Sequence, residues 1–312
     1  MSTIRTLTVC VSLSMMIAAS ASAGQIEDAF AAEQRGDYET TLRLFQPLAD
    51  QGDATAQFSL GVMFANGEGV TQQYTRAMQW YRKAADQGHS LAQYNIGVLF
   101  ENGQGVPQSH AEAAKWYRKA ADQGYAAAQT NLGMIYHKGQ GVPQNYAEAA
   151  KWSRKAADQG EAAAQFNLGA MYSDGQGVPQ NYAEAAKWSR KAADQGFAAA
   201  QFNLGVMYSD GRGVPQNYAE AVKWYRKAAD QGNASAQNNL GILYDEGNGV
   251  PQDYVQAHIW LNLAASRYPA SEKENRDKAI GNRDRVATKM TPAQVAEAQN
   301  LARVWKPTLA SK

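Results

Sequence analysis

The stretch Glu161–Gly196, EAAAQFNLGAMYSDGQGVPQNYAEAAKWSRKAADQG, decides the fold, because it returns 36 residues later as Phe197–Gly232 with only five changes. A glycine and a tryptophan keep this step along the chain. The glycines are Gly61, Gly97, Gly133, Gly169, Gly205 and Gly241. The tryptophans are Trp80, Trp116, Trp152, Trp188, Trp224 and Trp260. Such a fixed period is typical of stacked-repeat proteins, whose units bury their apolar faces against their neighbours.

Each unit predicts two helices joined by a glycine-rich loop. In the first helix, apolar residues such as Ala164 and Leu168 recur at steps of three and four, the period of an amphipathic helix. The loop Ser173–Pro179 contains a glycine suited to a left-handed helix end. Asn181 then predicts the start of the second helix, and Glu184 is placed to complete a capping box.

The second helix has an apolar stripe in which we expect Tyr182 and Trp188 to point inward. On its outer face, Arg190 and Asp194 are spaced for an ion pair one helical turn apart. Gly169 interrupts the first helix, at a cost of roughly 1 kcal/mol relative to alanine. We expect close approach of the second helix to be the reason, since a side chain would block it.

Residues 1–23 have the features of an export signal. Arg5 supplies positive charge, residues 7–19 are apolar, and Ala21-Ser22-Ala23 offers small residues for cleavage before Gly24. Cleavage there would remove Cys10, the single cysteine of the chain. We therefore expect a periplasmic or secreted bacterial protein without disulfides. No later segment predicts a transmembrane helix.

The chain is predicted to have four parts: the export signal at 1–23, a shortened N-terminal capping repeat at 24–52, the repeats at 53–268 and C-terminal capping helices at 269–312. The six repeats span 53–88, 89–124, 125–160, 161–196, 197–232 and 233–268. In the last part, Thr291 predicts a helix start with Gln294 as capping-box partner. Leu301 belongs to the apolar face expected of this helix.

The pattern Ala-x-Ala-Gln-x-Asn-Leu-Gly…Tyr…Gly-x-Gly-Val…Tyr…Ala…Trp-Tyr…Ala-Ala…Gly is legible in all six units. It resembles the Sel-1-like repeat, a relative of the tetratricopeptide repeat with a longer loop between its helices. The resemblance implies an all-α fold, a right-handed α-solenoid with a concave groove, and a role as an adaptor for protein complexes. A cysteine-rich branch of the family is described as binding or slowly hydrolysing β-lactams, but these repeats lack its paired cysteines.

No catalytic or metal-binding pattern is visible in the sequence. The four histidines are His89, His110, His137 and His258. They are scattered, without the i,i+4 pairing or cysteine partners of metal sites. The 30 Lys and Arg residues nearly balance the 29 Asp and Glu residues, which argues against a nucleic-acid partner. We expect no catalytic residue, no metal and no cofactor.

Positions that differ between near-identical units are not needed for stacking, so they mark a candidate binding surface. The first such position holds Phe58, Tyr94, Thr130, Phe166, Phe202 and Asn238. The second holds Val62, Val98, Met134, Ala170, Val206 and Ile242. The third holds Ala65, Glu101, His137, Ser173, Ser209 and Asp245. Steps of four and three put these positions on one helical face, which by resemblance to tetratricopeptide arrays lines the groove.

A row of asparagines stands beside this face: Asn95, Asn131, Asn167, Asn203 and Asn239. Their amides are able to donate to and accept from a peptide backbone, and in related repeats the equivalent asparagine can contact a bound peptide. A bond to a neighbouring repeat is the competing interpretation. The aromatic residues Phe58, Tyr94, Phe166 and Phe202 are either partner anchors or packing groups. These nine residues form the predicted partner-binding site.

We therefore expect a monomeric, non-enzymatic, exported scaffold that holds a protein or peptide in its groove. Two alternatives stay open. One is an envelope hydrolase, or a modulator of one, acting on β-lactams or peptidoglycan. The other is a secreted factor that meets host surfaces.

Overall fold

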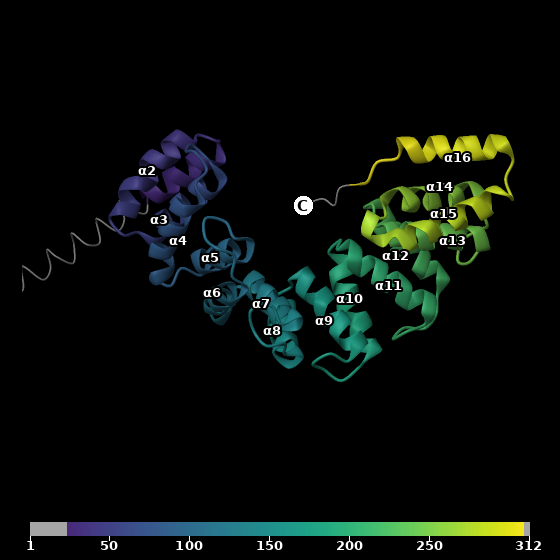
Figure 1. Cartoon of the computed structure of the whole chain (residues 1–312), viewed down its shortest axis with the longest axis horizontal. Helices are drawn as coiled ribbons and strands as arrows, with labels where there is room; N and C mark the ends of the chain where they lie inside the picture. Colours follow the sequence, from purple (N-terminus) through teal and green to yellow (C-terminus); the bar gives the residue numbers. More distant parts are fainter. Residues whose placement is uncertain (1–23, 309–312) are drawn as a thin grey trace, which may run out of the picture. The chain divides into compact units, whose positions relative to one another are not determined.

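The computed structural model describes residues 24–308, and every regular element in this range is helical (Figure 1). It divides into two compact units, Met1–Gln144 and Asn145–Lys312. The first contains a helix over residues 24–34, α2 (Tyr38–Asp50), α3 (Ala54–Asn66), α4 (Tyr74–Asp86), α5 (Ser90–Asn102), α6 (His110–Asp122) and α7 (Ala126–Lys138). The predicted export signal at 1–23 lies outside the described residues.

The second unit contains α8 (Tyr146–Asp158), α9 (Ala162–Asp174), α10 (Tyr182–Asp194), α11 (Ala198–Asp210), α12 (Tyr218–Asp230), α13 (Ala234–Glu246), α14 (Tyr254–Arg267), α15 (Lys273–Ala287) and α16 (Pro292–Val304), with a 3-10 turn at Ala270–Glu272. In both units consecutive helices pair, as α9 does with α10, and each pair packs on the next, as α10 does on α11. The all-α repeat fold predicted from the sequence is confirmed.

Glycine allows the two helices of a pair to approach closely. A Cβ atom added to Gly205 would overlap the ring of Tyr225. One added to Gly169 would lie 2.9 Å from Ser189 Oγ and 3.2 Å from the carbonyl oxygen of Ala185. The reason predicted for this glycine is therefore confirmed, since a side chain would separate the helices.

The loop inside a repeat needs two glycines for different reasons. Gly175 ends α9 with a left-handed φ of 70°, and its N–H donates to the carbonyl of Met171. Gly177 also has a positive φ, and it lies so close to Tyr146 that a Cβ would overlap that residue's carbonyl group. The loop thus ends one helix and contacts the preceding repeat.

Asparagine side chains cap the second helices α8, α10 and α12. Asn181 Oδ1 accepts from the N–H groups of Ala183 and Glu184. The reciprocal half of the capping box is wrong, because Glu184 accepts from Lys187 Nζ at 3.2 Å instead. The carboxylate gains a charged partner in this way.

A row of buried glutamines ties each repeat to the one before it. Gln165 Nε2 donates to the carbonyl of Ala157 at 3.1 Å, and Gln165 Oε1 accepts from Gln195 Nε2 at 2.8 Å. Gln201 and Gln231 make the same two bonds one repeat later. Because a buried amide is costly without partners, these bonds help to fix how successive repeats stack.

Arginines on the second helices also reach into the next repeat. The Arg190 guanidinium donates to Tyr208 Oη at 2.6 Å and lies over the Trp224 ring, 4.9 Å from its centroid. The predicted ion pair with Asp194 is wrong, because the cation gains a hydroxyl and an aromatic face in place of a weak surface pair. The predicted inward position of Tyr182 is also wrong: its side chain is 37% exposed at the start of α10.

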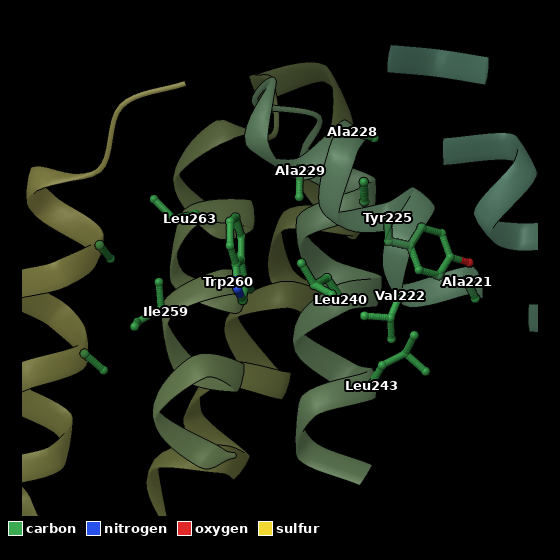
Figure 2. Close-up of a cluster of buried hydrophobic side chains, with 13 residues drawn as sticks. Ala221, Val222, Tyr225, Ala228, Ala229, Leu240, Leu243, Ile259, Trp260 and Leu263 are labelled. Atoms are coloured by element: carbon green, nitrogen blue, oxygen red, sulfur yellow. The ribbon is translucent and has the colours of Figure 1, made fainter. Parts of the chain in front are cut away.

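The C-terminal helices pack on α14. Thr291 caps α16 and forms the predicted capping box with Gln294. Ala298 joins a core cluster around Trp260 that gathers side chains from α12, α13, α14 and α16 (Figure 2). Leu301, which belongs to the predicted apolar face, is 43% exposed, whereas Ala298 and Ala302 of the same helix are buried. The small side chains of α16, rather than its leucine, lie against the repeats.

Candidate protein-binding surface

The variable face comprises the three variable positions of the first helices, and its aromatic side chains are half-buried. Each aromatic side chain packs against another ring. The centroid distances are 5.9 Å for Phe58–Tyr81, 5.5 Å for Tyr94–Tyr117, 5.3 Å for Phe166–Phe197 and 6.0 Å for Phe202–Tyr225. Phe58 also stacks on His89, the residue that opens the next repeat. These rings therefore contribute to packing within and between repeats and keep part of their surface exposed.

Three members of the asparagine row meet a tyrosine of the preceding repeat. The hydrogen-bonded pairs are Asn95 with Tyr81, Asn131 with Tyr117 and Asn239 with Tyr225. Burial raises the pKa of Tyr81 and of Tyr225 to about 12, while the bond from the asparagine opposes the rise. At these three places the asparagine amide links neighbouring repeats.

Asn167 and Asn203 have different neighbours. The residue after the repeat tryptophan is called here the ring position, and along the chain it holds Tyr81, Tyr117, Ser153, Ser189, Tyr225 and Leu261. Two repeats thus carry serine where three carry tyrosine, and Asn167 and Asn203 belong to the repeats that follow those serines. Whether these two amides contact a partner stays a proposal.

The fourth repeat has a hollow at its ring position, called here the Ser189 hollow. Its volume is about 150 Å³. It is lined by residues of three helices, among them Gly169 and Ala170 of α9, Ser189 of α10, and Asn203 and Val206 of α11. The hollow therefore lies inside one compact unit, at the variable face.

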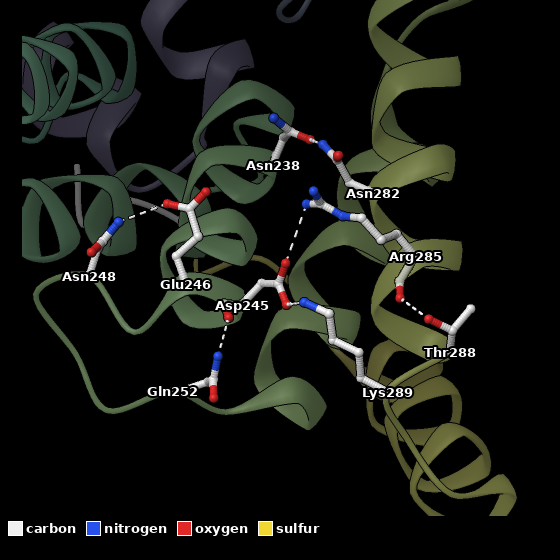
Figure 3. Close-up of polar contacts among 9 residues, drawn as sticks. All are labelled: Asn238, Asp245, Glu246, Asn248, Gln252, Asn282, Arg285, Thr288 and Lys289. Atoms are coloured by element: carbon white, nitrogen blue, oxygen red, sulfur yellow. Dashed lines mark hydrogen bonds and ion pairs between the residues drawn. The ribbon is translucent and has the colours of Figure 1, made fainter.

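In the sixth repeat the variable face is covered by α15 and the residues just after it (Figure 3). Asp245, whose side chain is only 3% exposed, pairs with Lys289 Nζ at 2.5 Å and with Arg285 at 3.3 Å. Asn282 Nδ2 donates to Asn238 Oδ1 at 3.4 Å. Two of the three variable positions of α13 are therefore bound through polar contacts.

The third variable position of the sixth repeat makes an apolar contact. Ile242 packs against a buried cluster formed by Ala257, Leu261 and Val286. Val286 comes from α15, and Leu261 occupies the ring position. All three variable positions of this repeat consequently face the same covering segment.

From the sequence alone, this segment was assigned to the C-terminal capping helices, and its contact with the variable face was not predicted. A signal was present in the spacing. Asn282, Val286 and Lys289 follow one another at steps of four and three, which places them on one helical face. The same steps of four and three separate Asn238, Ile242 and Asp245 on the variable face of α13.

Histidine and acidic side chains do not gather into a metal-binding group in the described part of the chain. Within residues 24–308, no group of three or more His, Cys, Asp or Glu side chains is arranged to hold a metal ion. His89 serves as a helix cap, its Nδ1 accepting from the N–H of Ala92 at 3.3 Å. In the same residues, no helix is long and apolar enough to cross a bilayer.

Comparison with known proteins bears directly on the repeats. Six consecutive stretches match the Sel1 repeat: residues 54–89, 90–125, 126–161, 162–197, 198–233 and 234–268. A search of curated proteins finds no match. The matched stretches together cover more than half of the chain.

Two solved structures resemble the chain over most of its length. A protective antigen present in uropathogenic Escherichia coli strains, which displays an SLR fold, is 38% identical with a TM-score of 0.73 over 84% of this chain. This chain spans 56% of that protein. A Sel1 repeat protein from Oxalobacter formigenes is 32% identical with a TM-score of 0.70, and the match covers 77% of this chain and 96% of that one. The chain belongs to the Sel1 repeat family.

Proposed function

We propose that this chain is an exported, non-enzymatic adaptor that holds a partner protein on the variable face. Sel1 repeat proteins are generally scaffolds for protein–protein interaction, and their fold is typically non-enzymatic. The observation that carries the proposal is the packing of α15 across the variable face of the sixth repeat (Figure 3). A helix of this chain already uses the face as a docking surface.

The contacts of α15 indicate what chemistry suits the face. Val286 supplies one apolar side chain, while Arg285 and Lys289 meet the carboxylate of Asp245. Charge-assisted bonds to a shielded carboxylate are stronger than bonds between neutral groups. A partner helix with apolar and polar residues at steps of three and four satisfies the same requirements.

Earlier repeats offer the same positions with other side chains. Met134 is 41% exposed, and Ala170 and Val206 line the Ser189 hollow. The asparagine amides of Asn167 and Asn203 lie in the same row. These groups support a partner that places apolar side chains on the variable face and polar backbone groups beside the asparagines.

Export is part of the proposal and is supported by the sequence of residues 1–23. N-terminal sequencing of protein recovered from the cell envelope should begin at Gly24. Fractionation of culture supernatant against periplasm then separates a periplasmic adaptor from a secreted factor. Size-exclusion chromatography with light scattering should give the mass of a monomer.

A photo-cross-linking amino acid placed at Ala170 tests the docking face. The matched control is the same amino acid at Lys191, an exposed residue of α10 outside that face. We expect a discrete cross-linked protein from the Ala170 variant only. That protein is then purified, and its affinity for the wild type and for Val206→Glu is measured by calorimetry.

A loss of at least about tenfold in affinity is expected for Val206→Glu, because a carboxylate buried without a partner costs more than 1.4 kcal/mol. Equal cross-linking from Lys191, or equal affinity of the two proteins, would contradict the proposal. Turnover of nitrocefin or muropeptides by the purified chain, abolished by a single polar substitution, would contradict its non-enzymatic part.

A further inference from the structure

Three repeats place a tyrosine in the same setting. The ring lies on the repeat glycine, so closely that a Cβ atom at Gly61, Gly97 or Gly205 would overlap it. In the fifth repeat, the hydroxyl of Tyr225 hydrogen-bonds Asn239 of the next first helix and Ser209 of its own repeat. The setting of Tyr225 therefore consists of a glycine, an asparagine and a serine, whereas Tyr81 and Tyr117 share the glycine and the asparagine but have Ala65 and Glu101 at the position of the serine.

The fourth repeat keeps the whole setting but has no ring. Gly169, Asn203 and Ser173 stand one period before Gly205, Asn239 and Ser209. All three line the Ser189 hollow. The groups that receive a tyrosine in the fifth repeat thus surround an empty space in the fourth.

The size of the hollow fits one aromatic ring. Its volume is about 150 Å³, and cavities of roughly that volume hold a benzene molecule in other proteins. One repeat later, a hollow of about 280 Å³ has Tyr225 itself in its wall. In the fifth repeat the ring of Tyr225 lies against Gly205, so the space beside the glycine is filled and the hollow lies outside the ring.

The hollow opens where a docked protein would lie. Its lining includes Ala170, Ser173 and Val206, which belong to the variable face. Arg212 also lines it, and this arginine stands where the fourth repeat has Gln176. A side chain from a protein on the variable face can therefore reach the hollow directly.

We propose that the Ser189 hollow receives a tyrosine side chain of the bound protein, in the place that Tyr81, Tyr117 and Tyr225 fill in their own repeats. This inference rests on the proposed adaptor function and names the residue that the adaptor recognises. The bound ring packs on Gly169, and its hydroxyl bonds with polar groups that line the hollow, among them Ser189, Asn203 and Ser173.

The polar groups select tyrosine over other apolar side chains. Phenylalanine fills the same space but leaves the polar groups that line the hollow without the phenolic partner. Tryptophan exceeds the volume of one ring. In the sixth repeat the ring position holds Leu261, and there Val286 of α15 packs on the leucine.

The test uses N-acetyl-L-tyrosinamide as probe and N-acetyl-L-phenylalaninamide as its matched control. Nuclear magnetic resonance follows the backbone amide of Gly169 and the side-chain amide of Asn203 during titration. We expect saturable shifts at both groups, with the tyrosine probe binding about fivefold more tightly, as one net hydrogen bond predicts.

Two exchanged variants complete the experiment. Ser189→Tyr should abolish the shifts at Gly169, because it restores the residue that the fifth repeat holds in the same setting. Tyr225→Ser should create new saturable shifts at Gly205 and Asn239. Shifts at Gly169 that survive in Ser189→Tyr, or saturable shifts in neither wild type nor Tyr225→Ser, would overturn the proposal.

The outcome is separate from that of the cross-linking experiment. A partner that binds the variable face of wild type and Ser189→Tyr equally, with no probe bound, refutes the tyrosine site and leaves the adaptor function standing. A probe that binds at Gly169, in a chain whose variable face captures no partner, refutes the adaptor function instead.

Discussion

The fourth and fifth repeats differ at five positions out of 36, yet one has a hollow where the other has a buried ring. Their frames are otherwise equivalent. Gln165 and Gln201 bond to the preceding repeat in the same way, and Arg154 and Arg190 each lie over the next repeat's tryptophan at 4.9 Å. Stacking therefore does not require the tyrosine. The ring of Tyr225 adds buried surface to repeats whose stacking contacts form without it.

The largest effect is expected from Tyr225→Ser, which makes the fifth repeat resemble the fourth. Tyr225 is 2% exposed, and removing a buried aromatic ring costs about 3 kcal/mol through lost burial and the cavity left behind. Urea unfolding followed by circular dichroism measures the loss. Ser189→Ala, which removes only a hydroxyl from the fourth repeat, is the control and should change stability far less. Equal losses in both variants would mean that the two positions are not energetically distinct.

The difference in folding stability between wild type and Tyr225→Ser should depend on pH in the alkaline range. The ordinary pKa of tyrosine is 10.0, and burial raises that of Tyr225 to about 12. Between these values the unfolded chain releases the phenolic proton while the folded chain keeps it, so folding stability falls as pH rises. The slope is about 1.4 kcal/mol per pH unit, and the loss approaches about 2 kcal/mol by pH 12.

The difference in stability between wild type and Tyr225→Ser should therefore be greatest below pH 10 and should shrink toward pH 12. Unfolding in urea at a series of pH values checks this. A difference that stays constant from pH 8 to pH 12 would show that the phenol is not protected from ionisation in the folded chain.

Much of the frame was predictable because it depends on local chemistry that every repeat shares. The step of 36 residues, the glycine at each close approach and the capping residue Asn181 all have a direct sequence signal. Contacts across repeats were harder to predict. The Arg190–Tyr208 bond joins residues 18 apart, and the local spacing to Asp194 suggested another partner.

The candidate surface was predictable as a set of positions but not as a set of contacts. Variation between units identified Asn238, Ile242 and Asp245, and α15 contacts all three. The spacing could not reveal which segment would cover them. The exchange of tyrosine for serine at Ser189 was visible in the sequence, but the hollow that it leaves depends on three-dimensional packing.

A smaller difference in stability should separate alanine substitutions at Gly205 and at Gly169. In Gly205→Ala, the new methyl group overlaps the Tyr225 ring, and we expect a net loss of about 1 kcal/mol after the gain in helix propensity. In Gly169→Ala, the nearest atom is Ser189 Oγ at 2.9 Å, and this hydroxyl has the hollow to turn into, which leaves only the tight backbone contact with the Ala185 carbonyl oxygen at 3.2 Å. We therefore expect a smaller loss than for Gly205→Ala. Thermal and urea unfolding of the two variants compare them, and a larger loss for Gly169→Ala would contradict the assignment.

The smallest effect should distinguish two members of the asparagine row. Asn239→Ala removes the partner of the buried Tyr225 hydroxyl, whereas Asn203→Ala removes a side chain that borders the Ser189 hollow. Both changes gain the same helix propensity, so their difference isolates the hydrogen bond, worth about 1 kcal/mol. If the difference in unfolding free energy is near zero, the amide of Asn239 does not stabilise the stack. If Asn203→Ala by itself leaves the unfolding free energy unchanged, Asn203 is a member of the row that the stack does not require, and its amide is available to a tyrosine from outside.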